Sequence, residues 1–115
     1  MQSINIAIKK DGFVETIEVP ANYTRKGLAV HVSHNQPKKK RYTKYTVTHI
    51  CTGVGLPAWR LFFVNGTDAV YSGYSRPSLN QIKTRIKELN LDCRKMSLKE
   101  VNEYLKDKLA FNKEV

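Results

Sequence analysis

The sequence predicts an α+β fold in a single domain, residues 1–115, with an antiparallel sheet of five to six strands over residues 3–74 and two C-terminal helices packed on one face. Apolar residues alternate along several short segments in the first two thirds of the chain, as in half-buried strands. In the last third they recur every three or four residues, as on one face of a helix. Strands followed by helices are typical of a sheet covered by helices.

The expected strands, in chain order, are residues 3–10, 13–19, 27–33, 43–52, 59–64 and 69–74. The dipeptides Asp11-Gly12 and Asn65-Gly66 suit a type I′ turn, so each predicts a hairpin between the strands on either side of it. Pro20 ends the second strand, because proline cannot donate a hydrogen bond to the ladder.

Two segments between these strands lack a strand pattern. Residues 22–26 are expected to form a polar turn, and residues 52–55 a bend or bulge. Trp59, Leu61 and Phe63 alternate on one face of the strand at 59–64, which places the tryptophan in the core. The face of the sheet that lies away from the helices is expected to be free.

The two helices are expected near residues 79–90 and 98–110, and each begins with a capping box. In Ser78–Gln81 the serine hydroxyl can accept from the glutamine amide while the glutamine side chain bonds back to it, and Ser97–Glu100 repeats the motif. An apolar face follows each capping box: Leu79, Ile82, Ile86 and Leu89, then Leu98, Val101, Leu105 and Leu109.

The net charge of +10 comes almost entirely from the middle of the chain. Residues 19–67 contain eight Lys or Arg and no Asp or Glu, whereas residues 88–115 contain six bases and six acids. A protein surface usually mixes both signs, because interspersed opposite charges limit self-repulsion. A stretch of this length without a carboxylate indicates contact with a polyanion, and nucleic acid is the commonest candidate.

The densest basic segment, residues 37–45, lies between two expected strands. If it is extended, the charges from Lys38 to Lys44 spread over roughly 20 Å and form a stripe. Tyr42 offers a ring that either stacks on a base or packs at the edge of a strand, whereas Tyr45 is expected to pack against the sheet. The alternative is a solvated hairpin loop. The candidate contacts to nucleic acid in this segment are Lys38, Lys39, Lys40, Arg41, Tyr42 and Lys44.

Further basic residues lie near aromatic ones or on one face of an expected helix. Tyr23 is close in sequence to two cations of the polar turn, and Tyr71 and Tyr74 precede another cation before the first helix. On that helix two lysines four residues apart share a face. The further candidate contacts are Arg25, Lys26, Arg60, Arg76, Lys83 and Lys87.

These patterns predict a small, non-enzymatic protein that binds DNA or RNA in the cytoplasm, with no cofactor, no metal and no membrane segment. One alternative is an inhibitor of the phage or plasmid type, which binds an acidic surface or the nucleic-acid channel of a protein partner. Another is a protein that sequesters anionic nucleotides. A homodimer is expected, since exposed strand edges invite pairing.

Catalytic patterns are weak in this sequence. The central region has almost no carboxylates, which argues against a two-metal nuclease. His31 and His34 would point to opposite faces of a continuing strand, and His49 with Cys51 supplies only two possible zinc ligands. A metal-independent ribonuclease stays open as an enzymatic alternative, with residue types supplied by His31, His34, His49, Lys44 and Arg60.

Overall fold

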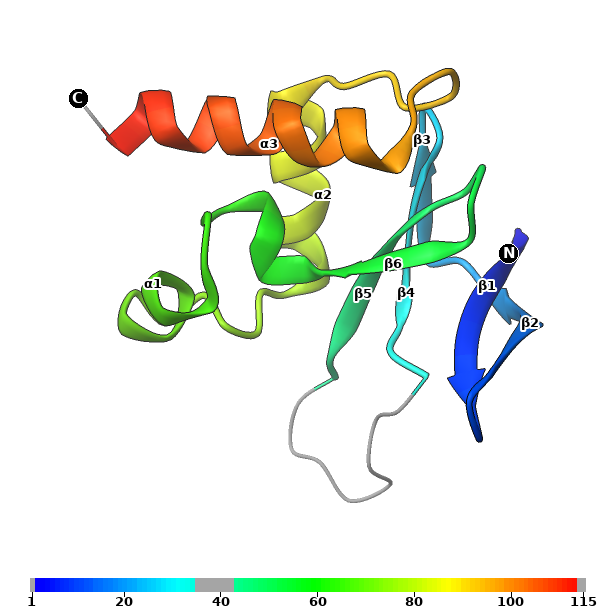
Figure 1. The fold of residues 1–115 in the computed structure, drawn as a ribbon. Helices are drawn as coiled ribbons and strands as arrows, with labels where there is room; N and C mark the ends of the chain where they lie inside the picture. Colours follow the sequence, from blue (N-terminus) through cyan, green and yellow to red (C-terminus); the bar gives the residue numbers. More distant parts are fainter. Residues whose placement is uncertain (1, 35–42, 114–115) are drawn as a thin grey trace.

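The computed structural model describes residues 2–34 and 43–113, with side chains up to Leu109, and shows an α+β fold (Figure 1). The strands of this part of the chain are β1 (Ser3–Lys10), β2 (Phe13–Pro20), β3 (Tyr23–Arg25), β4 (Leu28–Val32), β5 (Tyr45–His49) and β6 (Val54–Pro57). The helical segments are the 3-10 helix η1 (Ala58–Leu61) and the helices α1 (Gly66–Tyr71), α2 (Leu79–Leu89) and α3 (Leu98–Lys113). The predicted fold class is confirmed.

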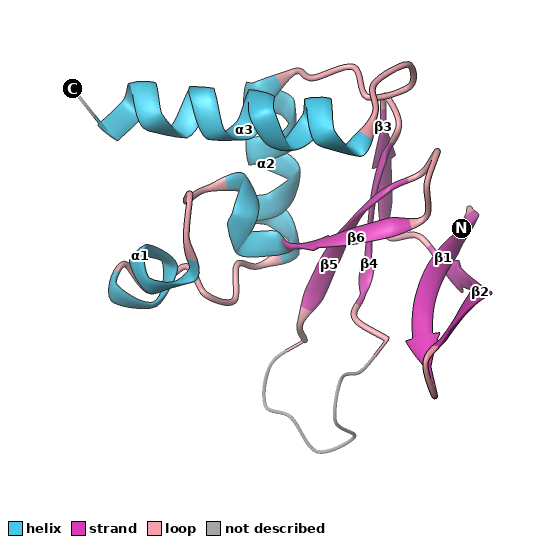
Figure 2. Ribbon diagram, in the orientation of Figure 1, coloured by secondary structure: helices cyan, strands magenta, loops and turns pink. Residues whose placement is uncertain are grey.

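The strands form two antiparallel sheets (Figure 2). A four-stranded sheet has the order β3-β4-β5-β6, and β1 pairs with β2 in a separate hairpin. In the larger sheet Val30 lies opposite Val47, so these two side chains project from the same face.

Helices α2 and α3 cover that face of the four-stranded sheet, as predicted (Figure 1). The buried side chains between sheet and helices include Leu28, Val30, Val47, Ile82, Ile86, Leu89, Val101 and Leu105. Ile82 has no exposed surface, and burial of such a side chain contributes about 1.5–3 kcal/mol relative to its exposure. The apolar faces predicted for the two helices are therefore the faces that form the core.

The other face of the sheet is not free, contrary to the prediction. The β1–β2 hairpin packs on it through a second core, in which Ile4 and Ile6 of β1 meet Ala29 of β4. A backbone hydrogen bond of 2.8 Å from Ala7 N to Gly53 O also joins the hairpin to the turn before β6. A two-stranded hairpin is marginal alone, so its apolar face is stabilised by burial against the larger sheet.

The strands expected at 59–64 and 69–74 are wrong, because these residues form η1, a loop and α1. The supposed hairpin turn at Asn65 is instead the start of a helix. The Asn65 Oδ1 atom accepts from Asp68 N at 3.0 Å, and the Asn65 amide donates to the Asp68 carboxylate at 3.1 Å. An N-cap asparagine and a turn asparagine look alike in sequence, and here the acidic residue three positions later favours the cap.

Two short strands are missing from the prediction. Tyr23–Arg25, expected as a turn, forms β3 at the edge of the sheet, and the turn that follows it is Lys26-Gly27, with φ of 46° and 91°. Val54–Pro57 forms β6 at the other edge, where a proline is tolerated because no further strand pairs with it there.

The local signals at the hairpin turn and at the helix starts are confirmed. Asp11 and Gly12 have φ of 51° and 82°, as a type I′ turn requires. The Ser78 hydroxyl accepts from Gln81 N at 3.2 Å, and Ser78 N donates to the Gln81 side chain at 2.8 Å. The second capping box forms the same pair of bonds at the start of α3.

Candidate functional site

The predicted nucleic-acid contacts are not all brought together. Five of them, Lys38, Lys39, Lys40, Arg41 and Tyr42, lie outside the described residues. Lys44 is exposed just before β5, and its carbonyl accepts from Ser33 N at 2.9 Å. It lies at the opposite end of β4 from the Lys26-Gly27 turn, and a strand of five residues spans about 17 Å.

Arg60 and Arg76 belong to other parts of the fold, η1 and the loop before α2. The Arg60 guanidinium donates to Phe63 O at 3.3 Å and to Asn102 O at 3.4 Å, so it joins η1 to α3. Burial lowers the pKa of Arg60, although the group stays charged at neutral pH. Arg76 is exposed in the loop that precedes α2.

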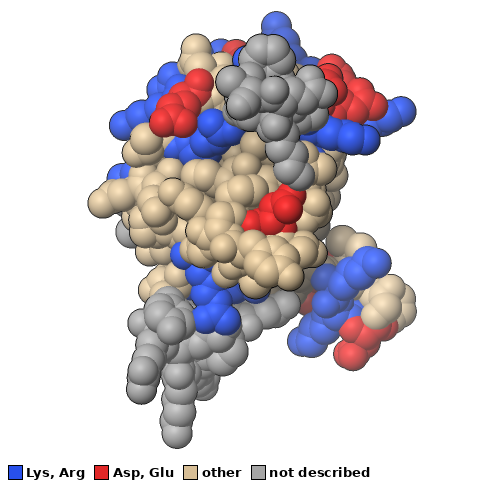
Figure 3. Space-filling model, turned by 90° about the vertical axis from the view of Figure 1, so that its left-hand side faces the viewer, with Lys and Arg blue, Asp and Glu red and all other residues tan. Residues whose placement is uncertain are grey.

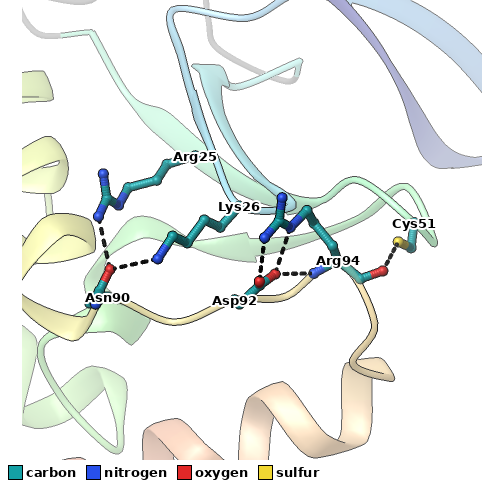
Figure 4. A network of polar contacts seen from close by, with 6 residues as sticks. All are labelled: Arg25, Lys26, Cys51, Asn90, Asp92 and Arg94. Atoms are coloured by element: carbon teal, nitrogen blue, oxygen red, sulfur yellow. Dashed lines mark hydrogen bonds and ion pairs between the residues drawn. The ribbon is translucent and has the colours of Figure 1, made fainter.

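Four of the predicted contacts gather around α2, and the first two meet at its C-terminal end (Figure 4). The Arg25 Nη2 atom donates to the Asn90 Oδ1 atom at 2.8 Å, and the Lys26 Nζ atom donates to the same oxygen at 3.0 Å. Since the two cationic nitrogens bond the same oxygen at 2.8 and 3.0 Å, they lie within about 6 Å of each other. Their shared acceptor is an uncharged amide, which neutralises neither of them.

Lys83 and Lys87 continue this group along α2. The Lys83 ammonium lies over the Tyr23 ring of β3, 5.4 Å from its centroid. Lys87 follows one helical turn later on the same side and is exposed. We define Tyr23, Arg25, Lys26, Lys83 and Lys87 as the α2 basic cluster. Its residues come from two segments that are distant in sequence and that the sheet–helix packing brings together.

The local fold explains the position of the Arg25 and Lys26 side chains. Asn90 is the C-cap of α2 and has the left-handed conformation, with φ of 45°. The last carbonyl groups of a helix bear partial negative charge, so cations are favourable there, typically by 0.3–1 kcal/mol each. Arg25 and Lys26 thus have a structural role beside any role in ligand binding.

Backbone contacts fix the turn that contains Lys26 against the segment after α2. Cys93 N donates to Lys26 O at 2.7 Å, and Ile50 N donates to Gly27 O at 2.9 Å. A Cβ atom at Gly27 would lie 2.7 Å from Arg94 N, which no side chain tolerates without a backbone shift. Glycine is therefore required here by close approach as well as by its positive φ.

One described carboxylate lies near the cluster, and it is already paired (Figure 4). The Asp92 carboxylate accepts from Arg94 Nε at 2.9 Å and from the Arg94 backbone N at 3.1 Å. These hydrogen bonds, with smaller contributions from the charges of Arg94 and Lys26, hold the pKa of Asp92 well below its ordinary value. Asp92 is thus an ion-pair partner of Arg94, and the α2 basic cluster keeps an excess of positive charge.

The cations of the cluster form no ion pair with a carboxylate of the described ranges. The Arg25 Nε atom is buried and has no hydrogen-bond acceptor among the same residues. Buried polar groups are normally satisfied, so Arg25 retains hydrogen-bonding capacity that residues 2–34 and 43–113 do not fill. The excess of positive charge in the cluster is what an anionic ligand would use.

The histidines considered for catalysis do not form one site. His31 and His49 are both buried, but they project from opposite faces of the sheet. The His31 ring nitrogens lie 2.9 Å from Val32 O and 2.6 Å from Thr48 Oγ1. Those of His49 lie 3.2 Å from Cys93 O and 2.9 Å from Thr52 Oγ1. Each ring has a hydrogen-bond partner for both of its nitrogens.

Comparison with protein-family models, with curated proteins and with solved structures finds no match to this chain. Among the residues that the structure describes, no three His, Cys, Asp or Glu side chains are grouped to hold a metal ion. No helix within these ranges has the length and apolar character needed to cross a bilayer. Asn90 was not predicted as part of the cluster, because its role depends on residues about 65 positions earlier in the chain.

Proposed function

We propose that the protein binds nucleic acid without catalysing a reaction, and that the α2 basic cluster contacts the phosphate backbone. The observation that supports the proposal is the convergence of four predicted cations, Arg25, Lys26, Lys83 and Lys87, at one place on the surface. None of them is paired with a described carboxylate. Phosphate oxygens are the partners that such groups bind most strongly.

The electrostatics favour an anion at this position. Two positive charges about 6 Å apart repel each other by roughly 0.7 kcal/mol in water, and by more where the surroundings exclude solvent. A phosphate between Arg25 and Lys26 would turn this repulsion into two attractive contacts. The Tyr23 ring is already covered by Lys83, so we expect attraction to phosphate to dominate over base stacking.

The experiment removes the two lysines of the cluster that have no hydrogen bond to the C-cap of α2. In the double variant Lys83→Gln/Lys87→Gln the affinity for duplex DNA should fall about 30-fold at 0.15 M salt, if each lysine neutralises one phosphate. The slope of log K against log salt concentration should become shallower by about 1.8 on duplex DNA and by about 1.4 on single strands. Fluorescence anisotropy at several salt concentrations measures both quantities.

A matched control removes two lysines from another helix. Lys106 and Lys108 are exposed on α3, and Lys106→Gln/Lys108→Gln changes the net charge by the same amount. Its salt slope should equal that of the wild type, and urea unfolding should show both double variants within about 1 kcal/mol of the wild type. Equal slopes for the cluster variant and the wild type would exclude Lys83 and Lys87 as phosphate contacts.

The form of the nucleic acid is tested with the same assay on single- and double-stranded DNA and RNA. A protein that binds another protein instead would show little affinity for any nucleic acid in this panel. A pull-down from lysate, with and without nuclease, would then recover its partner. Negligible affinity for all four forms, together with one protein band that survives nuclease, would replace the proposal with the inhibitor alternative.

A further inference from the structure

A groove lined by aromatic and uncharged polar side chains opens on the surface of the molecule. It lies between α1, α2 and the loop after η1, is closed by Leu109 of α3, and has a volume of about 960 Å³. Volumes of about 300–1,000 Å³ are typical of sites for small molecules. Figure 3 looks onto this side of the molecule, where uncharged residues cover a broad area and Lys and Arg side chains lie above and below it.

The walls of the groove include four aromatic side chains, Phe62, Phe63, Tyr71 and Tyr74. The Tyr74 ring centroid lies 5.2 Å from that of Phe62 and 5.9 Å from that of Phe63, so these three rings form one packed group. Tyr71 of α1 is 87% exposed, and its ring contacts no other ring within the described ranges. An exposed aromatic ring in a groove is a surface on which a planar ligand can stack.

The charged side chains of the lining already have partners. The Arg85 Nε atom donates to Leu61 O at 2.7 Å, and its Nη1 atom lies 3.4 Å from the Glu88 carboxylate. The Asp68 carboxylate accepts from the Asn65 amide at 3.1 Å, at the cap of α1. Because each charged group of the lining is engaged in this way, charge does not select the ligand, and an uncharged ligand is expected.

Uncharged hydrogen-bonding groups line the same groove. Asn80 and Thr84 are exposed four residues apart on one face of α2, and neither side chain forms a hydrogen bond with the residues that the structure describes. The hydroxyl groups of Tyr71 and Tyr74 also lack a hydrogen-bond partner in that part of the chain. Amide and hydroxyl groups both donate and accept, so they suit the polar edge of a flat heterocycle. A nucleobase combines such an edge with a planar ring that stacks on aromatic side chains.

We propose that the groove holds an unpaired base of a nucleic-acid strand whose phosphates contact the α2 basic cluster, which makes single-stranded nucleic acid the ligand. Thr84 of the groove and Lys87 of the cluster are three residues apart on α2, and the Cβ atoms of such a pair lie about 5–6 Å from each other. One nucleotide can therefore place its phosphate at the cluster and its base in the groove. The base contact rests on the phosphate contacts proposed above, which hold the strand next to the groove.

The test compares two strands with the same number of phosphates, oligothymidylate and a fully abasic oligonucleotide. Fluorescence anisotropy at several salt concentrations gives the affinity and the salt slope for each strand. We expect about fivefold or tighter binding of oligothymidylate, with equal salt slopes, because stacking on an aromatic side chain adds affinity without releasing counterions. Equal affinity for the two strands would overturn the proposal.

Two variants of α1 locate the base contact. Tyr71→Ala removes the exposed ring and should lower the affinity for oligothymidylate about fivefold or more, while the affinities for the abasic strand and for duplex DNA stay unchanged. Val70→Ala is the matched control, because Val70 is 66% exposed on the same helix and does not line the groove. It should leave all three affinities unchanged. For Tyr71→Ala, an equal loss on all three ligands, or no loss on oligothymidylate, would contradict the base contact.

The lysine variant of the cluster separates the base contact from the phosphate contacts. Lys83→Gln/Lys87→Gln should flatten the salt slope on both single strands and preserve the ratio of their affinities. An unchanged slope, with a ratio that still depends on Tyr71, would contradict the phosphate contacts alone. A flattened slope with a ratio of one in the wild type would contradict the base contact alone.

Free thymidine distinguishes a base within a strand from a free nucleoside. We expect it to bind far more weakly than oligothymidylate, because it lacks the phosphates that contact the cluster. Thymidine binding as tight as that of the oligonucleotide would assign the groove to a free nucleoside and overturn the proposed contact with a strand.

Discussion

Helix α2 separates two surfaces of different character. On one side Lys83 and Lys87 lie beside β3 and form part of the α2 basic cluster, and on the other Thr84 and Glu88 line the groove together with Phe62, Phe63 and Tyr74. Lys83 and Glu88 are five residues apart, which corresponds to about 140° around a helix. One short helix thus holds a basic surface and a mixed polar and aromatic groove in fixed relation, and the net charge of the chain describes neither of them.

The two surfaces also show how one residue type acquires different roles. Arg25 donates to an uncharged amide and keeps its full positive charge at the surface. Arg85 donates to a backbone carbonyl and faces a carboxylate three residues away, so its charge is largely balanced. The comparison teaches that the partner of each arginine, rather than the density of basic residues in the sequence, decides where positive charge is available.

The substitution with the largest expected effect tests whether the basic tract of residues 38–41 or the α2 basic cluster is the main contact to nucleic acid. If all four cations of the tract contact phosphate, replacing Lys38, Lys39, Lys40 and Arg41 with Gln should lower affinity for duplex DNA about 1,000-fold at 0.15 M salt. The salt slope should become shallower by about 3.6, twice the change expected for the two lysines of the cluster. Anisotropy titrations measure both, and an unchanged slope would leave the cluster as the only tested contact.

A core substitution should affect both surfaces at once. Ile82 is fully buried between α2 and the sheet, so Ile82→Ala should lower the free energy of unfolding by about 2–5 kcal/mol. Urea denaturation measures the loss. Near the new midpoint, binding to DNA should decline in step with the folded fraction. DNA binding that persists where the fold is lost would show that the contact does not depend on α2.

The smallest effect concerns acid stability at the cluster. The hydrogen bonds from Arg94 hold the pKa of Asp92 well below its ordinary value of 3.8, so the folded state favours the charged carboxylate. This contribution is fully present above the pKa of the unfolded chain and is lost as pH falls through the lower folded pKa. The difference in melting temperature between wild type and Asp92→Asn should therefore be constant at neutral pH and shrink in acid. A difference that stays constant down to pH 2 would contradict this ion pair.

Features determined by adjacent residues were predictable from the sequence, whereas competing local signals were not. Asp11-Gly12 and the two capping boxes depend on at most four consecutive residues, and all three form as predicted. At Asn65 two local motifs compete, a hairpin turn and a helix cap, and the hydrogen bonds between Asn65 and Asp68 form the cap. That one error turned η1 and α1 into strands and concealed the groove lined by α1, α2 and the loop after η1.

The candidate site was predictable as a set of residues but not as a shape. Arg25, Lys26, Lys83 and Lys87 were identified from charge and spacing, yet their convergence depends on the packing of β3 against α2. The amide that joins them, at Asn90, carries no charge and belongs to no motif. Arg60 was expected at the surface, and its bonds to Phe63 O and Asn102 O could not be foreseen while η1 was assigned to a strand.

The close approach at Gly27 has a consequence for how this protein can change in evolution. Any side chain at position 27 would push the turn away from the 93–94 segment. Descendants that keep a cationic surface here should therefore retain this glycine even where the charged residues have drifted. We therefore expect this position to vary less among homologues than the basic residues themselves.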